Sequence, residues 1–154
     1  MPKCTILVGV PASGKSTWLE DQDWRATIIS TDDIIEEVAR VYGFTYDQAF
    51  SNLVKFAEQV MWSRLKTAAE NGDPIYIDRT NMTARSRKKF IDFLKPFGYE
   101  FEAVVFPTPE PEEWKRRLDS RPGKTIPQEV LDRMVNSYEM PLMSEGFTKI
   151  TYVH

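Results

Sequence analysis

The 154-residue sequence has one cysteine, Cys4, and one histidine, His154, which is its last residue. A single cysteine excludes an internal disulfide, and Cys4 opens an apolar run that favours a core position for its thiol. A lone terminal histidine argues against a Cys–His zinc site and against a buried Ser-His-Asp triad. Neither kind of site is therefore expected to underlie the function.

Long hydrophobic runs are also missing. No apolar stretch approaches the roughly 20 residues that a membrane-spanning helix needs, and Met1-Pro2-Lys3 leads into a strand pattern instead of a secretory signal. The hydrophobic share of 42% and the charged share of 28% are typical of a globular protein. We expect one cytoplasmic domain that covers residues 1–154.

The formal net charge is −3, but it is distributed unevenly. Residues 79–124 carry eleven basic and seven acidic residues, whereas the rest of the chain carries nine basic and sixteen acidic residues. A locally basic region could bind a polyanion, or it could be a set of solvated helix faces. Composition alone favours the second interpretation.

Short apolar runs alternate with helical patterns along the chain. Strands are predicted at residues 4–8, 27–29, 75–77, 101–106 and 150–153. Helices are predicted at residues 15–21, from the cap at Ser30 to about residue 41, at residues 46–70, 84–97 and 110–120, and from residue 125 onward. This alternation predicts an α/β fold with a parallel sheet of about five strands and helices on both faces. Ligands of such sheets bind at the carboxyl ends of the strands, so chemistry is expected in the loops that follow them.

The loop after the first predicted strand fits the phosphate-loop pattern G-x-x-x-x-G-K-[ST] from Gly9 to Ser16. Its backbone N–H groups and the following helix N-terminus would hold the phosphates of ATP or another NTP. Lys15 should reach the β- and γ-phosphates, and the Ser16 hydroxyl should bind Mg²⁺. The predicted nucleotide-binding residues of this loop are Gly9, Ala12, Ser13, Gly14, Lys15, Ser16 and Thr17.

Other strand ends favour a kinase over other phosphate-loop proteins. The sequence lacks the N-K-x-D motif of a switch GTPase, and Asp78 is followed by Arg79 where a motor ATPase would have glutamate. After the second strand, Ser30 with Asp33 three residues later resembles a capping box, and Asp32 and Asp33 lie in the first turn of the helix that it would open. A carboxylate there could accept the proton of an incoming hydroxyl group, or both carboxylates could simply cap the helix.

A basic loop lies between the last two predicted helices. Arg116, Arg117, Arg121 and Lys124 flank Pro122-Gly123. A helical lid with these residues could close over the nucleotide and neutralise charge on the transferring phosphoryl group. The alternative is a solvated run of charges.

In combination, these motifs resemble the kinase domain of bacteriophage 5′-polynucleotide kinases and of related nucleic-acid end-healing enzymes. The resemblance extends from about residue 6 to residue 138. It rests on the segment from Gly9 to Trp18, on Ser30-Thr31-Asp32-Asp33, on Asp78-Arg79-Thr80-Asn81, and on Arg117-x-x-x-Arg121-x-x-Lys124-x-Ile126-Pro127.

The resemblance implies transfer of the ATP γ-phosphate to the 5′-hydroxyl of DNA or RNA during nucleic-acid repair, in the cytoplasm of a bacterial or phage-infected cell. By position, it makes Lys15 and Asp32 catalytic, Asp32 as the general base, and Arg121 the lid arginine that stabilises the transition state. Arg117 would support the lid or the nucleotide. The residues it suggests for substrate binding are Asp33, Asp78, Arg79, Asn81, Arg85 and Arg87.

Two departures from the family pattern stand out. The phage enzymes have an arginine that grips the substrate phosphate at the position of Ile35, so Arg79, Arg85 or Arg87 would have to replace it. No D-x-D-x-T phosphatase motif follows Asn136, so a kinase without a phosphatase domain is expected.

Two alternatives remain open beside the polynucleotide kinase. The first is a small-molecule kinase that acts on a nucleoside, sugar or antibiotic hydroxyl, which Ile35 favours. The second is a nucleotide-dependent binding module, which Asp32 and Arg121 argue against because a binder needs neither. A polynucleotide kinase should have an acceptor tunnel lined by basic residues, whereas a small-molecule kinase should have a closed polar pocket.

Overall fold

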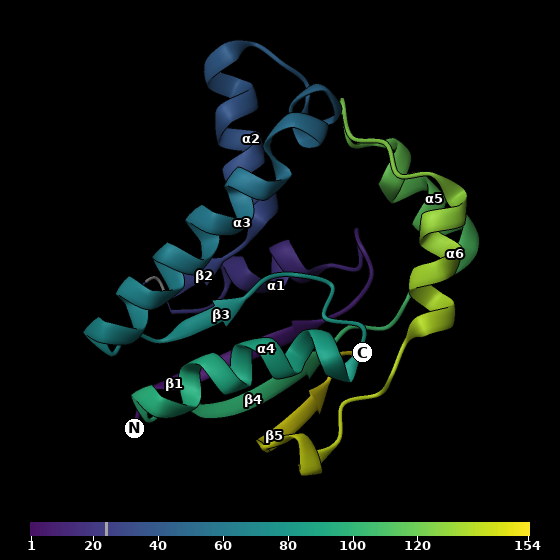
Figure 1. Ribbon diagram of the computed structural model, residues 1–154. Coiled ribbons are helices and arrows are strands. Elements are labelled where there is room, and N and C mark those ends of the chain that lie inside the picture. The colour runs from purple at the N-terminus through teal and green to yellow at the C-terminus, as the bar shows by residue number, and fades with distance from the viewer. Residues whose placement is uncertain (24) are drawn as a thin grey trace.

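Five parallel strands form one sheet in the computed structural model, which describes residues 1–23 and 25–154 (Figure 1). The strand order is β2-β3-β1-β4-β5, and every neighbouring pair is parallel. The central strand, β1, is apolar on both faces, and Cys4 to Val8 are all buried in it. The strands are β1 (Lys3–Val8), β2 (Thr27–Ile29), β3 (Ile75–Ile77), β4 (Glu100–Val105) and β5 (Phe147–Tyr152).

Helices cover both faces of this sheet, as the sequence predicts. Leu7 packs with Trp18 and Leu19 of α1 on one face, whereas Ile6 and Val8 belong to the larger core on the opposite face, which α3 and α4 complete. The α/β fold class is therefore confirmed. The helices are α1 (Lys15–Glu20), α2 (Thr31–Tyr42), α3 (Tyr46–Asn71), α4 (Ala84–Leu94), α5 (Pro111–Asp119) and α6 (Gln128–Ser137), with 3₁₀ turns η1 (Lys95–Phe97) and η2 (Met143–Glu145). Among the described residues, no helix is long and apolar enough to cross a membrane.

Prolines shift two of the predicted helix boundaries. The predicted helix 84–97 ends at Leu94, and Pro96 lies in the separate turn η1. The last helix begins at Gln128 with Pro127 as its N-cap, so it does not start at residue 125. A proline has no N–H to donate and its ring disfavours the helical conformation in the residue before it. Thr125 therefore lies outside the helix, and its N–H donates to Asp47 Oδ1 at 3.1 Å.

Two helical pairs stand at the carboxyl ends of the strands. Figure 1 shows α2 and α3 on one side and α5 and α6 on the other, with the loop between α5 and α6 meeting the start of α3. At this contact, the Asp47 N–H donates to the Gly123 carbonyl at 3.0 Å. Gly123 has a φ of 71°, and a Cβ there would lie 2.9 Å from the Thr45 Cβ. Only glycine fits this close approach, which seats the lid loop, residues 120–127, on the first turn of α3.

A buried ion pair connects α4 with the turn that precedes β5. The Arg87 side chain is fully buried, and its Nε and Nη2 donate to Glu145 at 2.8 and 3.0 Å. Its Nη1 donates to the Asn81 carbonyl at 2.8 Å. This geometry corrects the prediction that Arg87 binds substrate, because its guanidinium is committed to partners inside the fold.

We expect Glu145→Gln to lower the free energy of unfolding by about 3–5 kcal/mol, because it leaves the buried Arg87 charge uncompensated. Urea unfolding followed by circular dichroism measures the effect. Asp92→Asn is the matched control, since it removes an exposed ion pair with Lys88 and should cost about 0.5 kcal/mol or less. Equal losses in the two variants would contradict a structural role for the buried pair.

Candidate active site

The phosphate loop after β1 is folded tightly. A Cβ at Gly9 would lie 2.7 Å from Ser13 Oγ and 3.0 Å from Phe106 Cβ, so a larger residue would displace the loop. Gly14, with a φ of 102°, is the N-cap of α1. Ala12 also has a positive φ, of 61°, a conformation that costs energy for a residue with a side chain. The sequence motif does not indicate this strain at Ala12.

Side chains from two different helices hold three carbonyl groups of the loop. Lys15 Nζ donates to the Gly9 carbonyl at 2.8 Å. From α5, Trp114 Nε1 donates to the Pro11 carbonyl at 2.8 Å, and Arg117 Nη1 donates to the Ala12 carbonyl at 3.2 Å. Because these carbonyl groups accept hydrogen bonds from side chains, the shape of the loop is fixed. Its backbone N–H groups are then the ones that can bind an anion. Sequence reasoning assigned Arg117 to the nucleotide and missed Trp114, whose indole nitrogen supports the loop directly.

Two buried polar atoms in this region have no hydrogen-bond partner within the described part of the chain. They are Ser13 Oγ and Arg121 Nε, and both belong to residues predicted to bind the nucleotide. Buried donors of this kind are rare unless a ligand or ion completes them. An oxyanion such as a phosphate group fits both atoms, so the residues present suit the nucleotide that the motif implies.

The electrostatics of Lys15 point the same way. Burial lowers the pKa of the Lys15 ammonium to about 8, the nearby carboxylates of Asp78 and Asp32 oppose this change, and Arg121 lowers the pKa further. A bound phosphate would supply the negative charge that the buried ammonium lacks. Asp78, Asp32 and Arg121 are all close enough to act on the Lys15 charge, so the fold gathers the ends of β1, β2 and β3 and the lid loop at one site.

A magnesium ion would find few protein ligands here. Ser16 is exposed at the start of α1, where its hydroxyl can reach an ion on the phosphates. The described residues contain no group of three or more His, Cys, Asp or Glu side chains placed to hold a metal. Mg²⁺ commonly takes one or two protein ligands and completes its shell with phosphate oxygens and water, so Ser16 is the residue that would hold it beside a nucleotide.

A cavity of about 380 Å³ lies beside the phosphate loop and contains Asp32. Phe50, Val54, Val130 and Met134 give it an apolar wall, and Pro11 of the loop borders it. Its charged lining residues are Asp32, Asp47, Glu58, Asp78, Arg79, Arg121 and Lys124. Acidic residues thus outnumber basic ones, so the cavity is not the basic tunnel expected for a polynucleotide kinase.

Ion pairs neutralise two of the three basic residues in this cavity. Arg79 Nη2 lies 2.8 Å from Glu58 Oε1, and Lys124 pairs with Glu36. The Arg79 guanidinium also lies over the Phe90 ring, 5.9 Å from its centroid. Arg79 therefore borders the acceptor side, as predicted, but its charge is balanced in this state.

Three acidic residues near the phosphate loop follow two strand ends. Asp32 lies in the first turn of α2, where its Oδ1 accepts a 2.5 Å hydrogen bond from the Tyr46 hydroxyl. Asp33 follows it, and its N–H donates to Ser30 Oγ at 3.3 Å, which confirms the predicted cap at Ser30. Burial raises the pKa of the Asp78 carboxyl after β3, the Lys15 ammonium opposes this, and the charge of Asp32 adds to it.

Two other residues predicted to bind substrate lie elsewhere. Asn81 is buried with a φ of 49°, and its Nδ2 donates to the Leu7 carbonyl at 2.7 Å, so it ties the loop after β3 to β1. Arg85 is exposed in the first turn of α4 and is not among the residues that line the cavity. The cavity therefore brings together Asp32, Asp78, Arg79 and Arg121 without Arg85.

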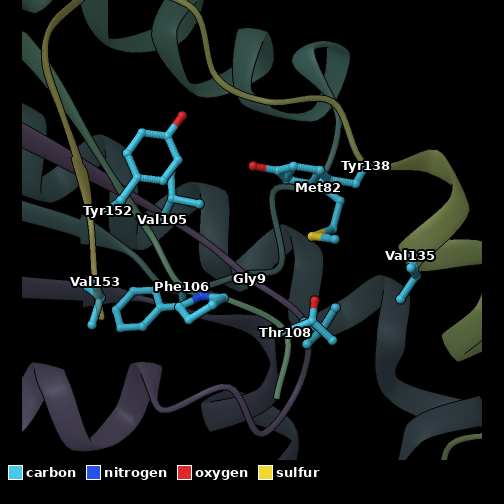
Figure 2. A pocket seen from close by; sticks show the side chains of 11 residues that line it. Gly9, Met82, Val105, Phe106, Thr108, Val135, Tyr138, Tyr152 and Val153 are labelled. Atoms are coloured by element: carbon cyan, nitrogen blue, oxygen red, sulfur yellow. The ribbon is translucent and has the colours of Figure 1, made fainter. Parts of the chain in front are cut away.

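A second cavity, of about 270 Å³, opens on Gly9 but differs in character. Figure 2 shows Tyr138 and Tyr152 beside it, together with Met82 and Thr108. Its lining includes no charged residue, so it lacks the carboxylates and cations that line the first cavity. Apart from Gly9, no predicted site residue lines it.

A sheet of this order, with a phosphate loop after its central strand, matches the fold of P-loop kinase structures. The family model described as "AAA domain" (AAA_33) matches residues 5–141, so the chain belongs to that family. This family match supports the phosphotransferase class that the sequence predicts, and the acceptor is a separate question.

Curated relatives cover nearly the whole chain. It is 22% identical over 159 residues to heterogeneous nuclear ribonucleoprotein U-like protein 2 of Homo sapiens, which matches 96% of this chain and 21% of the relative. It is 26% identical over 153 residues to the bifunctional polynucleotide phosphatase/kinase of Schizosaccharomyces pombe, with 96% and 32% covered. The chain thus spans about a fifth to a third of these relatives.

Solved structures share the fold. A chain of the PezAT chromosomal toxin–antitoxin system of Streptococcus pneumoniae matches all of this chain and 67% of its own length, with a TM-score of 0.72 and 21% identity. A chain of the Pnkp1/Rnl/Hen1 RNA repair complex matches 88% of this chain and 43% of its own length, with a TM-score of 0.65 and 25% identity.

We expect Lys15 to take up close to one proton when ATP binds at pH 9, and almost none when ATP binds at pH 7. The free Lys15 ammonium loses its proton as the pH rises through about 8, whereas the phosphates favour the charged form. Calorimetry in buffers of different ionisation enthalpy measures this uptake. Lys149→Ala is the matched control, since it removes an exposed lysine outside the site and should leave the uptake unchanged. Equal uptake at both pH values would contradict the lowered pKa of Lys15.

Proposed function

We propose that the chain is an ATP-dependent kinase that phosphorylates the 5′-hydroxyl end of a polynucleotide. The observation that carries this proposal is one cavity lined by Asp32, Arg121 and the phosphate-loop residue Pro11. A hydroxyl group held there would have a carboxylate on one side and the γ-phosphate on the other. Phosphoryl transfer depends mainly on such positioning and on charge stabilisation.

The proposed reaction is a direct displacement. The acceptor oxygen forms a bond to the γ-phosphorus, the bond to the bridging oxygen of ATP breaks, and ADP leaves. The proton of the hydroxyl moves to Asp32, whose Oδ1 is already engaged by Tyr46, so Oδ2 is the oxygen that would receive it. Lys15 would stabilise the β- and γ-phosphates, and Arg121 would stabilise charge on the transferring group. Mg²⁺, held through Ser16, would supply further neutralisation of the phosphates.

The cavity walls support a nucleoside as the acceptor group. The apolar side chains of Phe50, Val54, Val130 and Met134 line the cavity together with polar groups. A nucleobase can stack on an aromatic ring while its ribose hydroxyl reaches the polar side. The relative named as a polynucleotide phosphatase/kinase, 26% identical across most of this chain, gives independent support.

A small-molecule kinase is the second candidate, and the charges of the cavity favour it. The pairing of Arg79 with Glu58 and of Lys124 with Glu36 leaves little positive charge for the phosphates that follow the first nucleotide. Ile35 is buried, so it cannot replace a phosphate-binding arginine. An acceptor without phosphates, such as a nucleoside or a sugar, needs no such charge.

The test is transfer of labelled γ-phosphate from Mg–ATP to a short oligonucleotide with a 5′-hydroxyl, beside the same oligonucleotide with a 5′-phosphate. We expect label on the first and none on the second. Lys15→Ala, Asp32→Ala and Arg121→Ala should each lower kcat at least about a hundredfold, the usual effect of losing a charge clamp or a positioned base.

Exposed residues outside the cavity provide the matched controls. Asp92→Ala and Arg133→Ala change an exposed carboxylate and an exposed guanidinium, and both should keep turnover within about twofold. Transfer to a nucleoside but not to the oligonucleotide would support the second candidate. Full turnover in Asp32→Ala would overturn the assignment of the base under either candidate.

A further inference from the structure

Tyr46, the first residue of α3, touches both halves of the candidate site. Its hydroxyl donates to Asp32 Oδ1 at 2.5 Å. On its ring face, Lys124 Nζ lies 4.6 Å from the ring centroid, within the range of a cation–π contact. Lys124 belongs to the lid loop, three residues after Arg121. One side chain thus connects the acidic residue of α2 with the lid.

The lid loop is fixed to α3 by backbone contacts beside Tyr46. The Asp47 N–H donates to the Gly123 carbonyl at 3.0 Å, and the Thr125 N–H donates to Asp47 Oδ1 at 3.1 Å. Lys124 lies between these two contacts and also pairs with Glu36 of α2. The position of Lys124 over the Tyr46 ring therefore depends on where the lid loop lies.

Asp32 depends on Tyr46 for its orientation. Among the hydrogen bonds of the described residues, the one from Tyr46 is the single bond that the Asp32 side chain accepts. Asp32 is otherwise exposed in the first turn of α2, where its carboxylate could rotate. Burial and the hydrogen bond to Asp32 raise the pKa of the Tyr46 hydroxyl above its usual value. Tyr46 therefore keeps its proton and acts as a donor throughout the working pH range.

We propose that Tyr46 is a positioning residue: it orients the Asp32 carboxylate for proton transfer, and through Lys124 it makes that orientation depend on closure of the lid. The proposal rests on the proposed function, in which Asp32 is the general base. With Oδ1 held by Tyr46, Oδ2 is left to face the acceptor hydroxyl. A base that is correctly oriented only under a closed lid limits turnover to the state in which Arg121 also covers the nucleotide.

Tyr46→Phe tests the first half of the proposal, because it removes the hydroxyl and keeps the ring that Lys124 contacts. The measurement is kcat and KM in the phosphate-transfer assay for the wild type, Tyr46→Phe, Asp32→Asn and the double variant. We expect Tyr46→Phe to lower kcat about tenfold, with KM for ATP within twofold and an unchanged urea midpoint. In the Asp32→Asn background, Tyr46→Phe should cause no further loss.

The outcomes separate this proposal from the proposed function. Losses that multiply in the double variant, or an unchanged kcat in Tyr46→Phe, overturn the positioning role of Tyr46. Full turnover in Asp32→Asn instead overturns the assignment of the base, on which the proposal rests. A fall in the urea midpoint of Tyr46→Phe that accounts for the lost activity would also overturn it.

A second measurement needs no acceptor. Hydrogen exchange of the wild type, with and without a non-hydrolysable ATP analogue, should show that the analogue protects both residues 121–125 and the first turns of α3. Lys124→Gln removes the cation over the Tyr46 ring, so protection of α3 should be lost while the analogue still binds. Lys115→Gln is the matched control, since it changes an exposed lysine of α5 outside the lid loop. Unchanged protection of α3 in Lys124→Gln would overturn the link between the lid and the base.

Discussion

The site depends on hydrogen bonds that join three neighbouring strand ends. The Gly9 N–H donates to the Thr80 carbonyl at 3.0 Å, and the Phe106 N–H donates to the Val8 carbonyl at 2.8 Å. The Asn81 side chain reaches the Leu7 carbonyl from the loop after β3. Together these bonds fix the loops after β3 and β4 against the start of the phosphate loop. Parallel pairing brings the carboxyl ends of β1, β3 and β4 to the same edge of the sheet. The hydrogen bonds between the loops then fix the distance at which the Lys15 and Asp78 charges act on each other.

Acidic side chains hold the basic residues of the site in place before any ligand binds. Glu113 forms an ion pair with Arg117, whose Nε lies 2.9 Å from Oε1. Glu58 pairs with Arg79, and Glu36 pairs with Lys124. The two arginines also donate to, or pack on, other fixed groups, so their long side chains lose little freedom when a phosphate arrives. Preorganisation of this kind favours transition-state stabilisation over simple binding.

Much of the fold and the nucleotide half of the site could be predicted from the sequence, because the signals are local. The apolar run of β1, the phosphate-loop motif and the cap at Ser30 each lie within a few residues. Contacts between distant segments could not be predicted in this way. Trp114 supports Pro11, 103 residues away, and neither residue type indicates such a bond.

Side-chain orientation set a further limit on sequence reasoning. Arg87 is predicted to bind substrate, but its side chain is fully buried, which is rare for an arginine. Its burial follows from Glu145, 58 residues later, which no helical pattern could indicate. The resemblance to a known family supplied Asp32 and Arg121, but it gave no sign of Tyr46, whose role depends on how α2 and α3 pack.

The burial of Cys4 has a practical consequence. Its thiol lies in the central strand with no exposed surface, and burial raises its pKa above the usual value. Thiol reagents act on the exposed thiolate, so the folded protein should be inert to them. A cysteine introduced at an exposed lid position would then be the one reactive thiol, and a fluorescent dye attached there could report lid movement in the otherwise unaltered chain.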